Sequence, residues 1–194
     1  MALAYSDITV ELKEISLKNR PPELFAFSSK GTVPVLCINN STVIDESLQI
    51  MKWALDQHDP KSWIDNKKKI QFEMIEIYDN EFKCWLDRYK YYDRYPDNNQ
   101  SYYRNKCAEY LSELNLLLNE NRYLVSNDLK LLDVAILPFI RQCANVDMQW
   151  FNKNFVNVTI WLNNLLESKL FLSIMDKYSE YKYAQDPLII NFTK

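Results

Sequence analysis

The residue types best suited to chemistry meet in one short stretch, residues 31–47, which reads GTVPVLCINNSTVIDES. At its end, Glu46 and Ser47 stand directly before apolar residues spaced by three and four, a pattern that predicts a helix beginning at Ser47. The first turn of a helix offers unpaired N–H groups and a positive dipole end, which bind carboxylates. Ser47 adds a hydroxyl, and the Glu46 carboxylate can accept from an ammonium group. The pair suits an amino-acid-like head group that carries both charges, although Asp-Glu-Ser before a helix is also ordinary capping chemistry.

The beginning of the same stretch suits an extended ligand. Gly31 is the only glycine of the chain, and it stands shortly before the Val33–Pro34 bond. An X-Pro bond beside strand residues is where cis peptides occur, and we expect one here. A cis bond would turn the N–H and C=O of Val33 outward, where they can pair with a peptide-like ligand as a strand edge does. We expect Gly31 in a tight turn with a positive φ.

Nucleophilic side chains are few and scattered. Cys37, Cys84, Cys107 and Cys143 are widely spaced without a C-x-x-C pair, which argues against a zinc ribbon and a vicinal redox pair. We expect Cys37 to be buried in a core strand and Cys107 and Cys143 to lie on apolar helix faces. Cys84 is the thiol for which a reactive role stays open. His58, the only histidine, follows a predicted helix and is expected to cap or link rather than to catalyse.

Composition excludes several classes of protein. A single glycine excludes a dinucleotide-binding fingerprint and a Walker phosphate loop, which need several glycines around one anion. A single histidine excludes a multi-histidine metal site, and we expect no metal. The net charge of -3 gives no electrostatic reason to expect a nucleic-acid or membrane partner. Apolar runs such as LLDVAILPFI are too short to span a bilayer, and residues 1–8 lack the features of a secretory signal. The expected location is cytoplasmic.

The pattern of apolar residues divides the chain into two parts. A small mixed unit, residues 1–57, is expected to hold a strand over 9–16, a short helix, a hairpin with a turn at 39–41, and the helix from Ser47. An all-helical unit, residues 62–194, follows, with no strand expected after Ile44. Its predicted helices cover residues 64–95, 101–120, 131–146, 155–167 and 168–178.

Two consecutive stretches, LKNRPPELFAFSSKGTVPVL and TVIDESLQIMKWAL, resemble the glutathione-binding half of the glutathione transferase family. They are most similar to its cysteine-type, glutaredoxin-like and omega-like bacterial branch. In that family a valine before the cis-proline pairs with the cysteinyl part of glutathione, and a Glu-Ser pair holds the γ-glutamyl end. The resemblance implies these roles for Val33 with Pro34 and for Glu46 with Ser47. Arg20 matches a basic position, usually lysine, that holds the glycyl carboxylate in omega-like members.

Later stretches, among them FKCWLDRYKYYDRY and WLNNLLESKLFLSIMDKY, look like the helical domain of the same family. The resemblance implies an α+β fold, with a thioredoxin-like domain at 1–57 followed by an all-α domain at 62–194. It implies glutathione as co-substrate, a small hydrophobic electrophile or a disulfide as second substrate, and a homodimer as a possible assembly. The implied activity is transfer of glutathione to electrophiles or reduction of glutathione mixed disulfides. The alternative is a non-catalytic glutathione-binding or interaction module.

The first residues depart from the family pattern. MALAYSD looks like the second half of the family's first helix, so the first strand and the catalytic loop are expected to lie upstream of Met1. No catalytic residue is therefore assigned within this chain, and its own activity is expected to be weak or absent. The strand over 9–16 would lack its neighbour and leave backbone groups unpaired. It could pair with VPVLCI, take a strand from another chain, or be completed by upstream residues.

A second departure lies before a predicted helix of the second unit. The family usually has serine or threonine three residues before the aspartate that matches Asp133, but this chain has Lys130. Losing such a cap costs about 1 kcal/mol, so the sequence predicts a weaker start to this helix.

Overall fold

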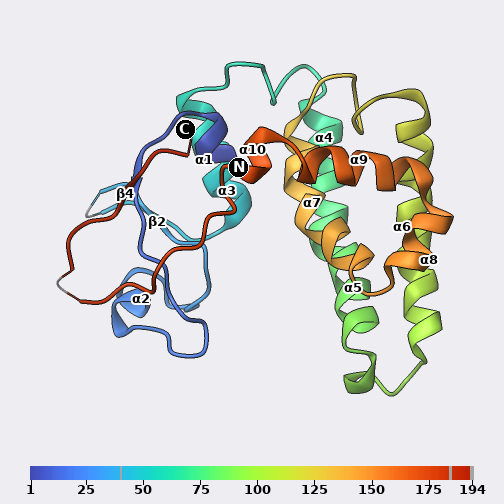
Figure 1. Cartoon of the computed structure of the whole chain (residues 1–194), viewed down its shortest axis with the longest axis horizontal. Coiled ribbons are helices and arrows are strands. Elements are labelled where there is room, and N and C mark those ends of the chain that lie inside the picture. The colour runs from blue at the N-terminus through green and yellow to red at the C-terminus, as the bar shows by residue number, and fades with distance from the viewer. Residues whose placement is uncertain (40, 184, 193–194) are drawn as a thin grey trace. The chain divides into compact units, whose positions relative to one another are not determined.

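A computed structural model describes residues 1–39, 41–183 and 185–192 of the chain. The structure divides into two compact units (Figure 1). The first consists of Met1–Lys61 together with Lys169–Lys194, and the second is Ser62–Ser168. The segment from Lys169 onward therefore groups with the first residues of the chain, which differs from the expected extent of 62–194 for the helical unit.

Among the described residues, four helices belong to the first unit. The prolines before ELFAF start α2 as expected, because a proline at the first helical position lacks only an N–H that would be unpaired anyway. The predicted helix from Ser47 is confirmed, and His58 is its C-cap, with its N–H bonded to the Ala54 carbonyl at 3.1 Å. The Tyr5 hydroxyl donates to Asp59 at 2.8 Å. The helices are α1 (Ala2–Tyr5), α2 (Pro22–Phe27), α3 (Ser47–Gln57) and α10 (Lys169–Leu172).

The strands found in the described part of the first unit are short and form two antiparallel pairs. β2 (Leu36–Cys37) pairs with β3 (Val43–Ile44) as the expected hairpin. The turn expected at 39–41 includes residue 40, which lies outside the described residues. β1 (Val10–Glu11) is shorter than the expected strand over 9–16, and it pairs with β4 (Ile189–Ile190). The expectation of no strand after Ile44 is therefore wrong.

The contact between β1 and β4 continues beyond the paired residues. The Leu12 N–H donates to the Leu188 carbonyl at 2.8 Å, and the Tyr181 N–H donates to the Glu14 carbonyl at 2.7 Å. The Asn191 side chain donates to Asp7 at 3.0 Å. Figure 1 shows the last part of the chain, in red, running beside the first strand. A segment of the same chain thus pairs with the strand that was expected to lack a neighbour, an arrangement outside the three considered.

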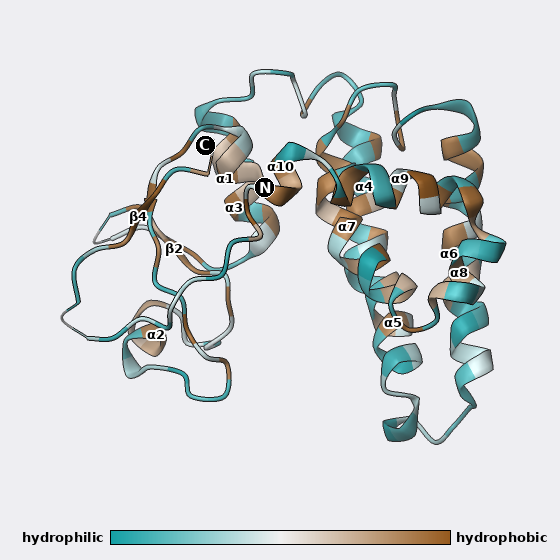
Figure 2. Ribbon diagram, viewed as in Figure 1, coloured by the Kyte–Doolittle hydropathy of each residue, from teal (hydrophilic) through white to brown (hydrophobic). Residues whose placement is uncertain are grey.

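Helices alone form the second unit among the described residues. The helix predicted over 64–95 is one continuous path, but it contains a π-helical turn at η1, and a short 3₁₀ turn, η2, follows it. The segment before the predicted helix at 155–167 forms a further helix, α8. Figure 2 shows the apolar residues concentrated on the inward faces of these helices. The elements are α4 (Lys68–Ile77), η1 (Tyr78–Phe82), α5 (Lys83–Lys90), η2 (Tyr92–Arg94), α6 (Gln100–Glu120), α7 (Leu131–Ala144), α8 (Met148–Asn154) and α9 (Val156–Leu166).

The start of α7 has partners that the sequence did not reveal. Asp133 is fully buried, and its carboxylate accepts from the Lys130 N–H at 3.1 Å. The next two N–H groups of the helix donate to the Trp63 carbonyl at 3.3 Å and to the Gln71 side chain at 3.2 Å. The ammonium group of Lys130 lies 2.9 Å from Asp65. Tertiary partners therefore replace the missing serine or threonine cap, and the expected weakening of this helix start is offset.

The cores of the units follow the expected α+β architecture, which is confirmed. Cys107 and Cys143 are buried on helix faces, as predicted, and Tyr89 is buried beside them in the second unit. Cys37 is exposed, so its expected burial is wrong: the two-stranded sheet of β2 and β3 leaves one side of that strand in solvent. None of the described helices has both the length and the apolar character that crossing a bilayer requires.

Candidate functional site

The loop between α2 and β2 turns sharply at Gly31. The φ of Gly31 is +59°, as predicted, and its N–H donates to the Ser28 carbonyl at 3.1 Å. A Cβ atom at this position would also meet the exposed ring of Phe25, which would have to move aside. The positive φ is the reason that glycine is favoured here.

The Val33–Pro34 bond is cis, as the sequence predicted. Val33 as a residue is 46% exposed. Within the described part of the chain, neither the N–H nor the C=O of Val33 has a backbone hydrogen-bond partner. These two groups are therefore available to an extended ligand, which is the property that the sequence pattern suggested.

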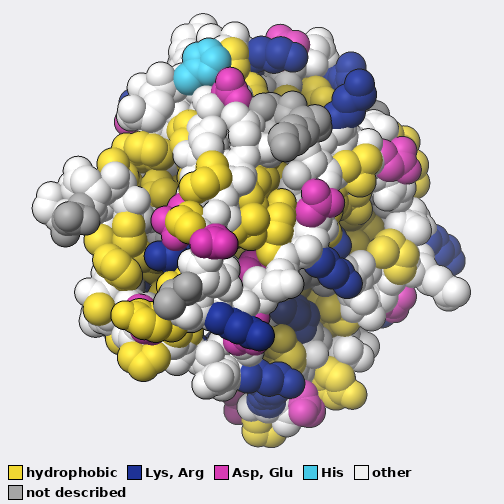
Figure 3. All heavy atoms as spheres, turned by 60° about the vertical axis from the view of Figure 1, so that its left-hand side comes forward, with side chains coloured by type: hydrophobic (Ala, Val, Ile, Leu, Met, Phe, Trp, Pro, Cys, Tyr) yellow, Lys and Arg dark blue, Asp and Glu magenta, His cyan; other side chains and the backbone are white. Residues whose placement is uncertain are grey.

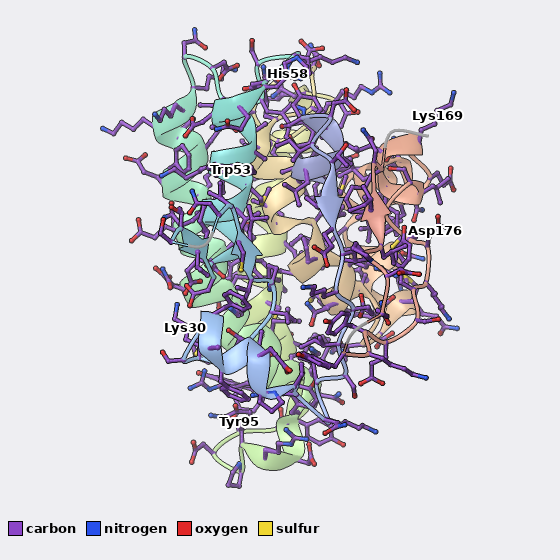
Figure 4. All side chains as sticks on the ribbon, turned by 90° about the vertical axis from the view of Figure 1, so that its left-hand side faces the viewer. Lys30, Trp53, His58, Tyr95, Lys169 and Asp176 are labelled. Atoms are coloured by element: carbon purple, nitrogen blue, oxygen red, sulfur yellow. The ribbon has the colours of Figure 1, made fainter. Side chains whose placement is uncertain are left out.

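Four residues bring the turn and the start of α3 together, and we call them the acidic corner: Ser28, Lys30, Asp45 and Glu46. The buried Ser28 hydroxyl donates to Asp45 at 2.7 Å. The Lys30 ammonium donates to Asp45 at 3.2 Å and is also bonded to Glu46. Figure 4 labels Lys30 in the loop after α2. Sequence reasoning missed Lys30, because an ion pair of a long exposed side chain leaves no periodic signal.

The charges of the acidic corner stabilise one another. The Ser28 hydroxyl and then the Lys30 ammonium lower the pKa of the Asp45 carboxyl. Glu46 and Asp45, in turn, raise the pKa of Lys30. The corner therefore holds two carboxylates against one ammonium near neutral pH, with one negative charge in excess. It lies at the start of α3, where Glu46 is the N-cap and Ser47 is the first, exposed residue.

Arg20 lies in a different environment of the same unit. It lines a cavity of about 240 Å³ together with residues of the last part of the chain, Glu180 and Tyr181. The Glu180 carboxylate accepts from the Ser16 N–H at 3.2 Å. Among the described residues, no hydrogen bond or ion pair links Arg20 to the acidic corner. The structure thus brings Glu46 and Ser47 close to the turn before Val33, but it does not connect Arg20 with them by a direct contact.

The exposed thiols and the single histidine lie outside the acidic corner. Although Cys37 is exposed, partial desolvation raises the pKa of its thiol above the ordinary value, which disfavours the thiolate needed for nucleophilic attack. Cys84 is exposed on α5 and contacts the guanidinium of Arg88. His58 is exposed at the end of α3 and is the cyan side chain in Figure 3. The described residues contain no group of three or more His, Cys, Asp or Glu that could hold a metal ion.

Comparisons with known proteins decide the fold. Residues 1–63 match the family model described as glutathione S-transferase, N-terminal domain. Glutathione transferase URE2P6 from Phanerochaete chrysosporium, solved with oxidized glutathione, superposes with a TM-score of 0.75 at 19% identity, over 88% of this chain and 85% of that one. This chain has the fold of the glutathione transferases.

Other solved structures agree. Poplar glutathione transferase F1 superposes with a TM-score of 0.74 at 18% identity, covering 90% of this chain and 88% of that one. A glutathione S-transferase-I bound with lactoylglutathione gives a TM-score of 0.69, also at 18% identity, over 86% of each chain. No curated protein matches the sequence. These likenesses establish the architecture, and the glutathione transferase fold here carries its first unit on residues 1–61 with the segment from Lys169.

Proposed function

We propose that this protein binds glutathione at the acidic corner and uses it as co-substrate, either transferring it to small hydrophobic electrophiles or reducing glutathione mixed disulfides. The observation that carries this proposal is the combination of an unpaired Val33 backbone with a helix start that bears an excess carboxylate. A peptide with a zwitterionic head group needs both features. Two solved structures with this fold, one bound with lactoylglutathione and one in complex with oxidized glutathione, support the choice of ligand.

The proposed pose follows from the charges. The γ-glutamyl ammonium pairs with Glu46, taking the position that the Lys30 ammonium now holds. The γ-glutamyl carboxylate accepts from the hydroxyl and N–H of Ser47 at the positive end of α3. The cysteinyl backbone then pairs with the N–H and C=O of Val33, next to Pro34, as an added strand pairs with an edge.

The glycyl carboxylate is the least determined part of the pose. Arg20 offers a guanidinium in the neighbouring cavity, but Glu180 lines the same cavity with a negative charge. A carboxylate placed there would lie near both the positive charge of Arg20 and the negative charge of Glu180. We therefore assign Arg20 a separate test: Arg20→Gln should weaken glutathione binding, and an unchanged affinity removes Arg20 from the site.

A second candidate is a glutathione-binding or interaction module without catalysis. The raised pKa of Cys37 favours this non-catalytic candidate, because Cys37 is the exposed thiol close in sequence to Val33. Catalysis on glutathione needs a group that stabilises its thiolate or a low-pKa protein thiol. Turnover of a generic aryl halide or of a glutathionylated disulfide separates the two candidates. Binding without either reaction identifies the module.

Binding is best measured by calorimetry with glutathione. We expect Glu46→Gln and Ser47→Ala each to lose about 1–3 kcal/mol of binding free energy, as for hydrogen bonds to charged groups. Glu23→Gln is the matched control, because Glu23 is an exposed acid in the first turn of α2 in the same unit. Wild-type protein that does not bind glutathione refutes the proposal. Equal affinity of Glu46→Gln and the control removes the acidic corner from the site.

A further inference from the structure

The helical unit contains a polar cavity that is unrelated to the acidic corner. Its volume is about 160 Å³, which at about 30 Å³ per water is room for roughly five waters or one small acid anion. It lies where α5, the first turns of α6 and the link from α7 to α8 meet. Figure 4 labels Tyr95, which lies in the segment leading to α6. The lining residues are Tyr89, Gln100, Ser101, Arg104, Val146 and Asp147.

One donor in this lining is buried without a partner. It is the Nε of Arg104, which has no hydrogen bond among the described residues. Tyr89 is 1% exposed as a residue, but its hydroxyl is not among the buried atoms without a partner in the described part of the chain. Buried polar groups in folded proteins are nearly always hydrogen-bonded, so the Arg104 Nε beside a cavity points to an acceptor that occupies it.

The guanidinium of Arg104 has two neighbours beside the cavity. It lies over the Trp150 ring, 4.9 Å from the centroid. One Asp147 oxygen forms an ion pair with it at 3.9 Å, which is beyond hydrogen-bond distance. The other Asp147 oxygen accepts from the Trp150 N–H at 3.0 Å, as the N-cap of α8. Arg104 is therefore placed by a ring and a carboxylate, while its planar donor fork keeps hydrogen-bond donors for a ligand in the cavity.

The remaining groups of the cavity are also mainly donors. Burial raises the pKa of Tyr89 to about 12, so its hydroxyl keeps its proton at neutral pH. Ser101 adds a hydroxyl beside the first turn of α6, a helix of 21 residues. Asp147 is the one acid in the lining, and its charge opposes a multiply charged ligand. A donor-rich cavity with one arginine and one aspartate suits a small ion with a single negative charge.

We propose that this cavity is a binding site for a small oxyanion, a carboxylate or a phosphate group, held by Arg104, Tyr89 and Ser101. The site is separate from the proposed glutathione site, because all of its residues lie in the second unit. Its test is therefore independent of whether the protein binds glutathione.

The experiment is an NMR titration of the full chain that follows the backbone N–H of Ser101. Sodium phosphate and sodium acetate are added separately, with sodium chloride at equal ionic strength as reference. We expect a saturable shift with phosphate, acetate or both, and none with chloride. A saturable shift with phosphate alone identifies a phosphate group as the ligand, and one with acetate alone identifies a carboxylate. Saturable shifts with both indicate a shared oxyanion site.

Two variants identify the donors. Arg104→Gln should abolish the saturable shift, and Tyr89→Phe should weaken binding by roughly threefold or more. Tyr89→Phe removes only a hydroxyl, so this variant folds even if Arg104→Gln does not. Arg122→Gln is the matched control, since Arg122 also stacks on an aromatic ring, Tyr123 at 5.5 Å, but does not line the cavity. A shift that does not saturate, that chloride reproduces, or that either variant leaves unchanged overturns the proposal.

Discussion

Replacing Asp133 by asparagine tests how the helical unit is held together at the start of α7. The Asp133 carboxylate accepts from the Leu124 N–H at 3.0 Å, from the Trp161 indole at 2.9 Å and from the Lys130 N–H. Asparagine keeps the shape of the side chain but turns an amide NH₂ toward one of these donors. We expect Asp133→Asn to lose about 1–3 kcal/mol at low pH, the cost of leaving one buried donor unpaired.

The pH dependence of this loss has a definite sign. Burial raises the pKa of the Asp133 carboxyl from 3.8 to about 6, in spite of the three donors around it. The folded state therefore binds the proton more tightly than the unfolded state. The stabilisation that comes from this tighter proton binding is fully present below about pH 4 and is lost as the pH rises through about 6. A rise of roughly two units in the pKa of Asp133 corresponds to about 3 kcal/mol of the free energy of unfolding. Asparagine does not titrate, so the difference in stability between wild type and Asp133→Asn should shrink by about this amount.

The assay is urea unfolding at several pH values between 4 and 7.5, followed by tryptophan fluorescence. Comparing the two proteins at each pH cancels the contributions of the other carboxyl groups. Asp128→Asn, in the exposed segment before α7, is the control and should stay within about 0.5 kcal/mol of wild type at pH 7. A gap that widens with rising pH would refute the reasoning, because it would mean that the three donors outweigh burial and lower the pKa of Asp133.

Two further changes test the first unit. Lys30→Met should tighten glutathione binding by up to roughly fivefold in calorimetry, because exposed ion pairs are weak and the ligand ammonium would no longer compete with lysine for Glu46. Lys18→Met changes an exposed lysine of the same unit and should leave the affinity unchanged; tightening in both variants would point to net charge alone. Ile190→Ala should lose about 2–5 kcal/mol of stability and speed hydrogen exchange of the Leu12 N–H, because Ile190 is buried. Ile189→Ala, at 61% exposure, should change little, and equal effects of the two would argue against β4 being docked on β1.

Local patterns were sufficient for most of the helices and for the turn at Gly31. The spacing of apolar residues depends only on neighbours three and four positions away, so the helix from Ser47 and those of the second unit could be predicted. The positive φ of Gly31 and the cis bond at Pro34 also have local causes. The π-helical turn in η1 and the separate helix α8 left no comparable signal, since both keep the helical spacing of the surrounding sequence.

Predictions that depended on the surroundings of a strand were less reliable. The run VPVLCI is continuously apolar, which is typical of a strand covered on both sides. Within the residues that the structure describes, the sheet at this point has two strands, and Cys37 is exposed. Lys30 was missed for a related reason: its partner Glu46 is sixteen residues away, and its position depends on the turn at Gly31.

The pairing of β1 with β4 separates what the sequence could predict, the need for a partner strand, from what it could not, the identity of that strand. The strand near Val10 was expected to require a neighbour because leaving backbone N–H and C=O groups unpaired costs free energy. That cost does not depend on which residues supply the partner. For the same reason the partner could not be identified: a ladder hydrogen bond can form with any extended segment. Only Leu188, Ile189 and Ile190 mark β4 in the sequence, and three apolar residues near the end of a chain are too few to indicate a strand. The requirement for pairing is thus readable from local sequence, whereas the segment that meets it is decided by the three-dimensional path of the whole chain.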